Sequence, residues 1–355
     1  MRSFRLLVFL SLAFTGLRAG DVVVETGRLD SGALYTVAKP LRWNGRVLLL
    51  AHAYRSDEQP LHASLPADSP LARPLLDQGW LVATTSFRRN GVILQDAIDD
   101  LDTLRRQIAA VHGPPQRVYL LGEAMGGAIV TRMVESLPDD YAGAVAISPD
   151  FQLQEPPPTL GLSLQPRRPL LLLANQSEIS APRGYVATAA KAAFPPVLWH
   201  VARNGHANVN SREKLAALAA LVRWVEEGRA PAPNADATRA PDNGPSQIAF
   251  APDNSAGAGR VTAVLPGSGD LVVNFQPADL ARLGIKSRTR FALVLGPRVI
   301  RVFYATTPAP VKRDEWLGFP EADGWFTLAI NRGNAAAVSG LRVGDAIVLR
   351  RLAEN

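Results

Sequence analysis

The chain has 355 residues, 47% of them hydrophobic, and a formal net charge of +6 at pH 7. This length favours two domains, and the apolar content excludes an intrinsically disordered chain. The small positive charge is not gathered into long basic runs, which argues against a nucleic-acid-binding protein. The sequence has no cysteine, which excludes disulfides, a thiol nucleophile and a lipid-modified cysteine.

The first twenty residues have the pattern of a secretory signal peptide. Arg2 and Arg5 flank an apolar run over residues 6–17, and Ala19 offers a small residue for cleavage. The run is shorter than the roughly 18 apolar residues of a membrane span, although an uncleaved N-terminal anchor is the alternative. We therefore expect a secreted or periplasmic protein with no integral membrane span once residues 1–20 are removed.

Residues 31–230 alternate strand-like and helix-like patterns, which is typical of a mostly parallel α/β sheet. We assign residues 21–228 to this domain. Short apolar runs predict strands at 46–51, 80–86, 117–121, 142–147, 169–174 and 197–202. Apolar residues at helical spacing predict helices at 94–108 and 211–227. The acidic residues of the first helix are expected to face solvent rather than to bind a metal: Asp96, Asp99, Asp100 and Asp102.

The pattern changes after residue 228. Residues 229–259 are rich in Pro, Ala and Asn and show no hydrophobic period, which predicts an interdomain linker. Residues 260–355 are rich in short strand-like runs separated by Gly or Pro, which predicts a small β-barrel domain. These runs lie at 261–265, 271–275, 290–295, 299–304, 325–330 and 346–349.

One glycine-rich turn carries the strongest functional signal. Gly122-Glu123-Ala124-Met125-Gly126-Gly127 follows a strand-like run and precedes a helix-like stretch. This is the setting of the nucleophile elbow, G-x-S-x-G, in which glycines allow a strained and crowded turn. The central position holds Ala124, which has no oxygen to attack a carbonyl. The sequence therefore indicates a hydrolase frame without its usual nucleophile.

With this elbow and this order of elements, residues 31–230 resemble the α/β-hydrolase family, in its secreted esterase or lipase form. The resemblance implies a doubly wound, mostly parallel sheet and the chain order nucleophile, acid, histidine. It implies that Ala124 stands at the nucleophile position. Glu178, just after the strand at 169–174, would be the acid, and His206, after the last strand, would be the base.

The resemblance also implies an oxyanion hole formed by the backbone N–H groups of Met125 and Tyr54. Where the family usually has His-Gly, this chain has His52-Ala53. No metal and no cofactor are expected. The implied ligand is an ester, either a small molecule or one linked to a polysaccharide.

The alanine at the elbow leaves three explanations open. It is an engineered inactivation, or the chain is a natural pseudoenzyme, or slower chemistry uses Glu123 or a water activated by His206. The expected function is that of a carboxylic-ester hydrolase or its inactivated relative. The alternatives are a noncatalytic binding protein that uses the same pocket and a structural envelope protein that assembles through its barrel.

The C-terminal region carries a second resemblance. Residues 328–336, Leu-Ala-Ile-Asn-Arg-Gly-Asn-Ala-Ala, are followed by Gly-Leu-Arg-Val-Gly-Asp at 340–345. These stretches resemble the C-terminal barrel of the S-adenosylmethionine hydroxide adenosyltransferases, and residues 269–275 resemble a degraded form of its Phe-Gly-Asn-x-x-Thr-Asn segment. The resemblance implies ligand contacts near Asn274, Arg332, Asn334 and Ala335. That family's larger N-terminal domain is absent here. We expect a barrel used for packing, oligomerisation or surface presentation, with a retained nucleoside-like or aromatic pocket as the alternative.

Overall fold

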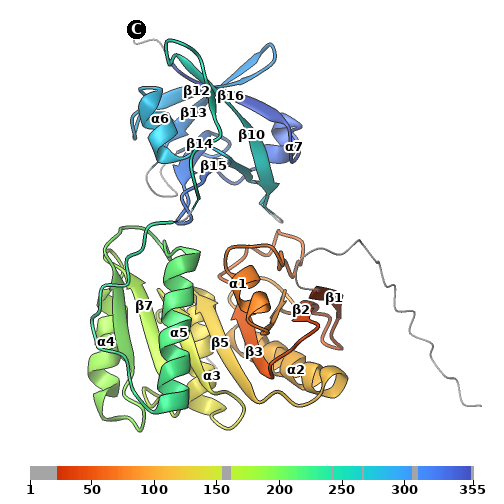
Figure 1. The fold of residues 1–355 in the computed structure, drawn as a ribbon, viewed down its shortest axis with the longest axis vertical. Coiled ribbons are helices and arrows are strands. Elements are labelled where there is room, and N and C mark those ends of the chain that lie inside the picture. The colour runs from red at the N-terminus through yellow and green to blue at the C-terminus, as the bar shows by residue number, and fades with distance from the viewer. Residues whose placement is uncertain (1–21, 154–160, 242, 266–267, 306–310, 353–355) are drawn as a thin grey trace, which may run out of the picture.

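The computed structural model describes residues 22–352, except 154–160, 242, 266–267 and 306–310. The predicted signal peptide therefore lies outside the described residues. The described chain forms an α/β domain and a β domain, which Figure 1 shows stacked along the long axis of the molecule.

The α/β domain is built on an eight-stranded sheet in the order β1-β2-β4-β3-β5-β6-β7-β8. The strands from β3 to β8 run parallel to one another. At one edge, β2 pairs antiparallel with both β4 and β1. Their bounds are β1 Val22–Arg28, β2 Leu34–Pro40, β3 Arg46–Ala51, β4 Leu81–Thr85, β5 Arg117–Glu123, β6 Gly143–Ile147, β7 Leu170–Asn175 and β8 Val197–Val201.

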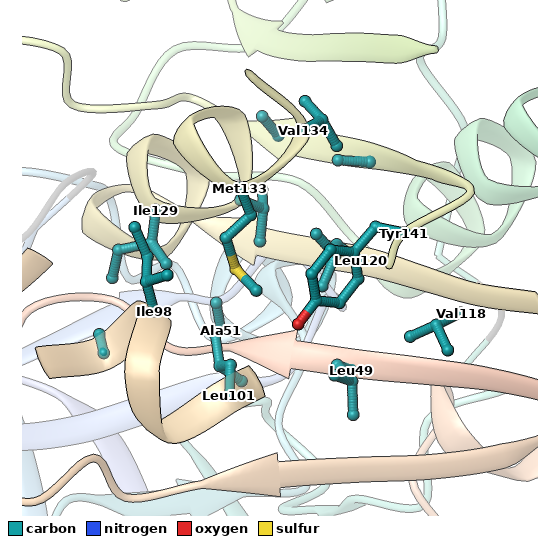
Figure 2. Packing of buried hydrophobic residues seen from close by; sticks show 14 of the residues in the cluster. Leu49, Ala51, Ile98, Leu101, Val118, Leu120, Ile129, Met133, Val134 and Tyr141 are labelled. Atoms are coloured by element: carbon teal, nitrogen blue, oxygen red, sulfur yellow. The ribbon is translucent and has the colours of Figure 1, made fainter. Parts of the chain in front are cut away.

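Helices cover both faces of this sheet, so its central strands read as continuous apolar runs. The helices are α1 Ala72–Asp77, α2 Leu94–His112, α3 Met125–Ser136, α4 Ser180–Thr188 and α5 Ser211–Glu227, with a 3₁₀ turn at Ala189–Lys191. On one face, Leu49 and Leu120 of the sheet pack with Leu101 of α2 and Met133 of α3 (Figure 2). A second core forms on the other face beneath α1 and α5. This doubly wound, mostly parallel sheet confirms the predicted α/β-hydrolase fold.

One acidic residue of α2 does not face solvent. Asp100 is fully buried, and its carboxylate accepts hydrogen bonds from the backbone N–H of Arg88 at 2.7 Å and from the guanidinium of Arg88 at 2.8 Å. The expectation that all four acidic residues are solvated is therefore wrong for Asp100. A buried carboxylate persists when a cation pairs with it, and here that cation comes from the loop before the helix.

The C-terminal domain is a closed β-barrel, as predicted. Its sheet has the order β11-β15-β14-β13-β12-β16-β10-β9, and a further β11–β10 pairing closes seven strands into a ring. Phe275, Phe291 and Phe326 fill the interior. The elements are β9 Ala249–Phe250, β10 Ala256–Val264, β11 Leu271–Val273, α6 Pro277–Arg282, β12 Arg290–Leu295, β13 Arg298–Tyr304, β14 Trp316–Pro320, β15 Phe326–Ile330, α7 Ala335–Ser339 and β16 Ala346–Arg351.

The segment between the domains lies against the edge strand β8. Asn234 donates its N–H to the carbonyl of Leu198 at 2.6 Å, and Ala237 donates to that of His200 at 2.8 Å. The prolines at 231 and 233 have no N–H to donate, which keeps this contact from extending into a regular strand. The expected boundary at residue 260 falls inside β10, which begins at Ala256.

The joint between β5 and α3 is the most crowded backbone contact near the elbow. A Cβ on Gly126 would lie 2.1 Å from the carbonyl oxygen of Ala51, and a Cβ on Gly122 would lie 2.2 Å from that of Gly126. Backbone on both sides leaves no flexible atom that could move away. Glycine at these positions therefore lets α3 start directly against the end of β3.

We predict that Gly126→Ala lowers the free energy of unfolding by about 2 kcal/mol or more, because the methyl group would overlap backbone atoms. Urea denaturation followed by circular dichroism measures this loss. The control is Gly184→Ala in α4, where nothing lies within 4 Å of the added Cβ. That change should be neutral or stabilising by up to about 1 kcal/mol, since alanine favours helix over glycine. Equal effects at the two sites would contradict the prediction.

Candidate active site

Ala124 occupies a strained turn between β5 and α3, with φ 51° and ψ −112°. Such a conformation is costly for a residue with a Cβ. Backbone hydrogen bonds hold it: Ala124 donates to the carbonyl of Ile147 at 2.9 Å, and its own carbonyl accepts from the N–H groups of Asp150 and Ala128, both at 3.1 Å. Ala124 thus occupies a strained strand-to-helix turn, and no hydroxyl group stands at the centre of that turn.

Glu178 and His206 form a hydrogen-bonded pair. Glu178 follows β7 and His206 follows β8, and Nδ1 of His206 lies 2.5 Å from Oε1 of Glu178. The second carboxylate oxygen accepts the N–H of Ala207 at 3.0 Å. The His206 side chain is 62% exposed. Since Nδ1 is engaged with Glu178, Nε2 is the ring nitrogen left to exchange a proton with a ligand or a water.

The contact between the two side chains shifts the pKa values of both groups in opposite directions. The hydrogen bond to Glu178 raises the pKa of His206; burial opposes this, and the charges of Glu178 and Asp150 add to the increase. Burial would raise the pKa of Glu178, but hydrogen bonds from His206 and Ala207 outweigh it and hold that pKa below its ordinary value. The carboxylate therefore stays charged and stabilises the imidazolium.

The segment after β6 connects the elbow to this pair. Ile147 and Asp150 hold the backbone of Ala124, and the charge of Asp150 also raises the pKa of His206. Ser148 is buried and adopts a positive φ of 39°, and its hydroxyl has no hydrogen-bond partner among the described residues. Sequence reasoning missed Asp150. A polar residue shortly after a buried strand, next to the elbow strand, is the signal that could have found it.

The loop that carries His206 is anchored from two sides. Asn175, at the end of β7, donates from Nδ2 to the carbonyl of Asn208 at 2.8 Å. Arg203 pairs with the fully buried Glu213 of α5 at 2.7 Å and donates to the same carbonyl at 2.8 Å. The histidine is thus exposed at its tip, but its loop is fixed at the base.

The predicted oxyanion donors lie on neighbouring elements. Met125 begins α3, and the N–H groups of a first helical turn have no partner within the helix. Tyr54 lies on the segment that leaves β3, where the carbonyls of Ala51 and His52 come close to Gly126. The side chain of Tyr54 is exposed. Burial lowers the pKa of His52 to about 4, so its ring is neutral at pH 7.

Glu123, the alternative nucleophile of the elbow, is engaged elsewhere. Its Oε1 lies 2.7 Å from Nζ of Lys214, which belongs to the first turn of α5 and is 13% exposed. An ion-paired carboxylate is a weak nucleophile in any case. The contact instead ties the elbow to α5.

The barrel contacts this same turn of α5. The carboxylate of Asp323, in the turn between β14 and β15, accepts the N–H of Ser211 at 2.8 Å and its hydroxyl at 3.1 Å. A negative charge at a helix N-terminus is favourable. Glu321 of the same turn interacts electrostatically with Lys214, and burial raises its pKa. One helical turn thus joins the barrel, the elbow and the His206 loop, a link that sequence reasoning missed.

The residues implied in the barrel each have a structural contact. Asn274 is buried, and its Oδ1 accepts the N–H of Arg260 at 2.7 Å. Asn334 caps α7 by accepting from Ala337 at 2.7 Å, and Ala335 is fully buried in the barrel core. Arg332 is exposed in the turn before them, with φ 57°. The structure places Arg332, Asn334 and Ala335 in one turn and Asn274 at the end of β11.

The described residues contain no group of three or more His, Cys, Asp or Glu side chains placed to hold a metal ion. Within the part of the chain that the structure covers, no helix is both long and apolar enough to cross a membrane.

One family model and several solved structures are similar to parts of this chain. The model of a family described as serine aminopeptidase, S33, matches residues 91–200. An esterase of Pyrococcus furiosus is 13% identical with a TM-score of 0.44, covering 59% of this chain and 94% of that one. A putative dienelactone hydrolase of Klebsiella pneumoniae is 14% identical with a TM-score of 0.41. The match covers 51% of this chain and 85% of that one.

A third solved structure is an uncharacterized conserved protein of Thermotoga maritima, 22% identical with a TM-score of 0.25 over 26% of this chain. The chain spans 35% of the length of that protein. A search of curated proteins finds no match. Together with the sheet order, the family match indicates a hydrolase-like α/β fold.

We predict that Glu178→Gln lowers the pKa of His206 toward its ordinary value of 6.5, because the hydrogen bond to a charged partner is lost. In the native protein the raised pKa means that the charged pair stabilises the fold fully below pH 6.5 and that this contribution disappears as the pH rises through the raised value. NMR titration of the His206 ring protons measures the shift. An unchanged pKa in the variant would show that Glu178 does not control the base.

A second prediction concerns the link between the domains. Asp323→Ala should lower the free energy of unfolding by about 1 kcal/mol, since it removes a charged partner from the N-terminus of α5. Thermal unfolding of the full chain measures the loss. Asp139→Ala is the control, because the side chain of Asp139 is 94% exposed and lies 3.5 Å from Arg168 in a weak surface pair. A loss no larger than that of the control would show that the contact contributes nothing.

Proposed function

We propose that the α/β domain is a carboxylic-ester hydrolase site that has lost its nucleophile and now binds esters without forming an acyl intermediate. The observation that carries this proposal is the strained backbone of Ala124 beside an intact His206–Glu178 pair. Backbone strain at a residue that has no reactive group is explained by a turn built to present one.

The chemistry that the site retains follows from its remaining groups. The N-terminus of α3 offers backbone N–H groups to the carbonyl oxygen of an ester. His206 keeps the pKa and the orientation of a general base, so Nε2 accepts a proton from any hydroxyl placed beside it. Ala124 supplies no such hydroxyl. Water is the remaining proton donor, and a water-based reaction is slow because water is not positioned as a serine side chain would be.

The first twenty residues support a proposal about location. Their charge and apolar pattern is that of an export signal, so we propose a secreted or periplasmic protein that meets small or polysaccharide-linked esters outside the cytoplasm. The exposed tip of His206 is accessible to an ester of either kind.

The decisive experiment restores the hydroxyl group. Ala124→Ser should raise the hydrolysis of short-chain aryl esters by roughly 10²-fold or more, because losing this group from a serine hydrolase costs on the order of 10⁶-fold. Ala124→Gly is the matched control that changes the side chain without adding a hydroxyl. Adding His206→Ala to Ala124→Ser should abolish the gain.

The other outcomes separate the alternatives. If Ala124→Ser gains nothing, the pocket has diverged from ester chemistry and the proposed hydrolase site is rejected in favour of a binding protein of another class. If the unaltered chain hydrolyses esters and His206→Ala removes that activity, a water activated by His206 is the nucleophile, and the proposed loss of catalysis is wrong.

A further inference from the structure

Arg55, on the segment that leaves β3 beside the elbow, is a half-buried cation that has no counter-ion among the described residues. Its Nη1 donates to the backbone carbonyl of His62 at 2.6 Å. Across the ranges that the structure describes, its guanidinium forms no ion pair. Burial lowers the pKa of Arg55 to about 10, and no carboxylate offsets that effect. At neutral pH the group therefore remains charged, with most of its five N–H donors available.

Other partly covered arginines of this domain have acidic partners. Arg88 pairs with Asp100 at 2.8 Å, and Arg203 pairs with Glu213 at 2.7 Å. The guanidinium of Arg105 forms ion pairs with the carboxylates of Asp102 and Asp140, each at 2.8 Å. Burying a charge is costly unless it is paired. Arg55 departs from the pattern of these three arginines, which suggests that its partner is a ligand.

The position of Arg55 fits a ligand contact. Its carbonyl accepts the N–H of Gly91 at 2.9 Å, so the loops after β3 and β4 pack together at the carboxyl edge of the sheet. Ligands bind at that edge in α/β sheets. Three residues earlier, the carbonyl of His52 lies against Gly126 of the elbow. Arg55 therefore lies on the same segment as His52, whose carbonyl meets the elbow, and its charge lowers the pKa of His52.

The charged groups around Arg55 leave it as the dominant cation there. Burial and the charge of Arg55 lower the pKa values of His52 and His62, so both rings stay neutral at pH 7. Asp57 and Glu58 lie on the same segment, but both are exposed and neither affects the pKa of Arg55. A planar guanidinium binds a carboxylate through two parallel hydrogen bonds.

We propose that Arg55 binds a carboxylate on the ester ligand, so that the site selects half-esters of dicarboxylic acids over neutral esters. This inference rests on the proposed function, because it names the class of ester that the site takes. Arg55 acts as a specificity residue: it recognises the free acid end of the ligand and takes no part in bond cleavage.

Calorimetry on the unaltered chain tests the inference directly. The probes are monomethyl succinate, which carries a carboxylate, and methyl 4-oxopentanoate, which has nearly the same shape and no charge. We expect monomethyl succinate to bind roughly tenfold tighter or better, the usual size of a charge-assisted hydrogen bond. Arg55→Met should remove this preference, and Arg55→Lys, which keeps the charge but not the planar fork, should retain part of it.

Two controls keep the result specific. Arg42→Met removes the same charge from an exposed site at the turn between β2 and β3, at the opposite edge of the sheet, and should leave the preference unchanged. Circular dichroism checks that Arg55→Met is folded, since Arg55 also bonds to His62. If that variant is unfolded, the reduced preference of Arg55→Lys decides the question.

The outcomes distinguish this inference from the proposed function. Equal affinity for the two probes, no binding of either, or a preference that survives in Arg55→Met overturns the role of Arg55. If Ala124→Ser hydrolyses neutral aryl esters in that case, the ester site still stands. If the preference depends on Arg55 and Ala124→Ser is inert, the carboxylate site stands and the hydrolase ancestry of the pocket fails.

Discussion

The contact between the start of α3 and the end of β3 is the constraint on which the candidate site depends. Gly126 meets the carbonyl of Ala51 at a distance that no side chain would allow, and this fixes where α3 begins. Ala124, the residue before the helix, has the strained positive φ that lets the chain turn into it there. Strain of this kind costs on the order of 1–3 kcal/mol, so surrounding contacts have to enforce it.

The first turn of α5 extends that rigid arrangement beyond the elbow. Its N-terminus is capped within the α/β domain by Asn210 and is also contacted by Asp323 of the barrel. Lys214 of the same turn pairs with Glu123. The barrel is therefore not connected to the α/β domain through the linker alone, because it also contacts α5, the helix that follows the His206 loop. Glu321 in the β14–β15 turn interacts electrostatically with Lys214, which pairs with Glu123 of the elbow.

The main elements of the fold could be read from the sequence because they have strong local signals. The central strands are continuous apolar runs, and α5 runs over residues 211–227 as the spacing predicted. The strands that gave weak signals were overlooked. β1 is largely exposed, and β14, Trp316–Pro320, contains a glycine and a proline that weaken a strand pattern. Such strands form because partners in the sheet pair with them, which a local pattern does not show.

The residues of the candidate site were likewise predicted where a local motif marks them and missed where only the packed structure brings them together. The elbow motif marked Ala124, and the order of the strands placed Glu178 and His206, whose side chains the structure brings into contact. The roles of Asp150 and Asp323 depend on segments far apart in the chain meeting at one edge, and no motif marks them. Likewise, the burial of Asp100 follows from Arg88 reaching across from a loop. Pairings between distant charges are set by the packed structure rather than by spacing.

The interdomain segment has a consequence for the solubility of the protein. β8 is the last strand of its sheet, and an open edge of this kind presents unpaired backbone groups that invite another chain to add on. Residues 234–237 occupy part of that edge through hydrogen bonds to Leu198 and His200. The proline-rich interdomain segment thus covers part of the open edge of β8. A protease that cut it would sever the two domains and also expose a strand capable of seeding aggregation.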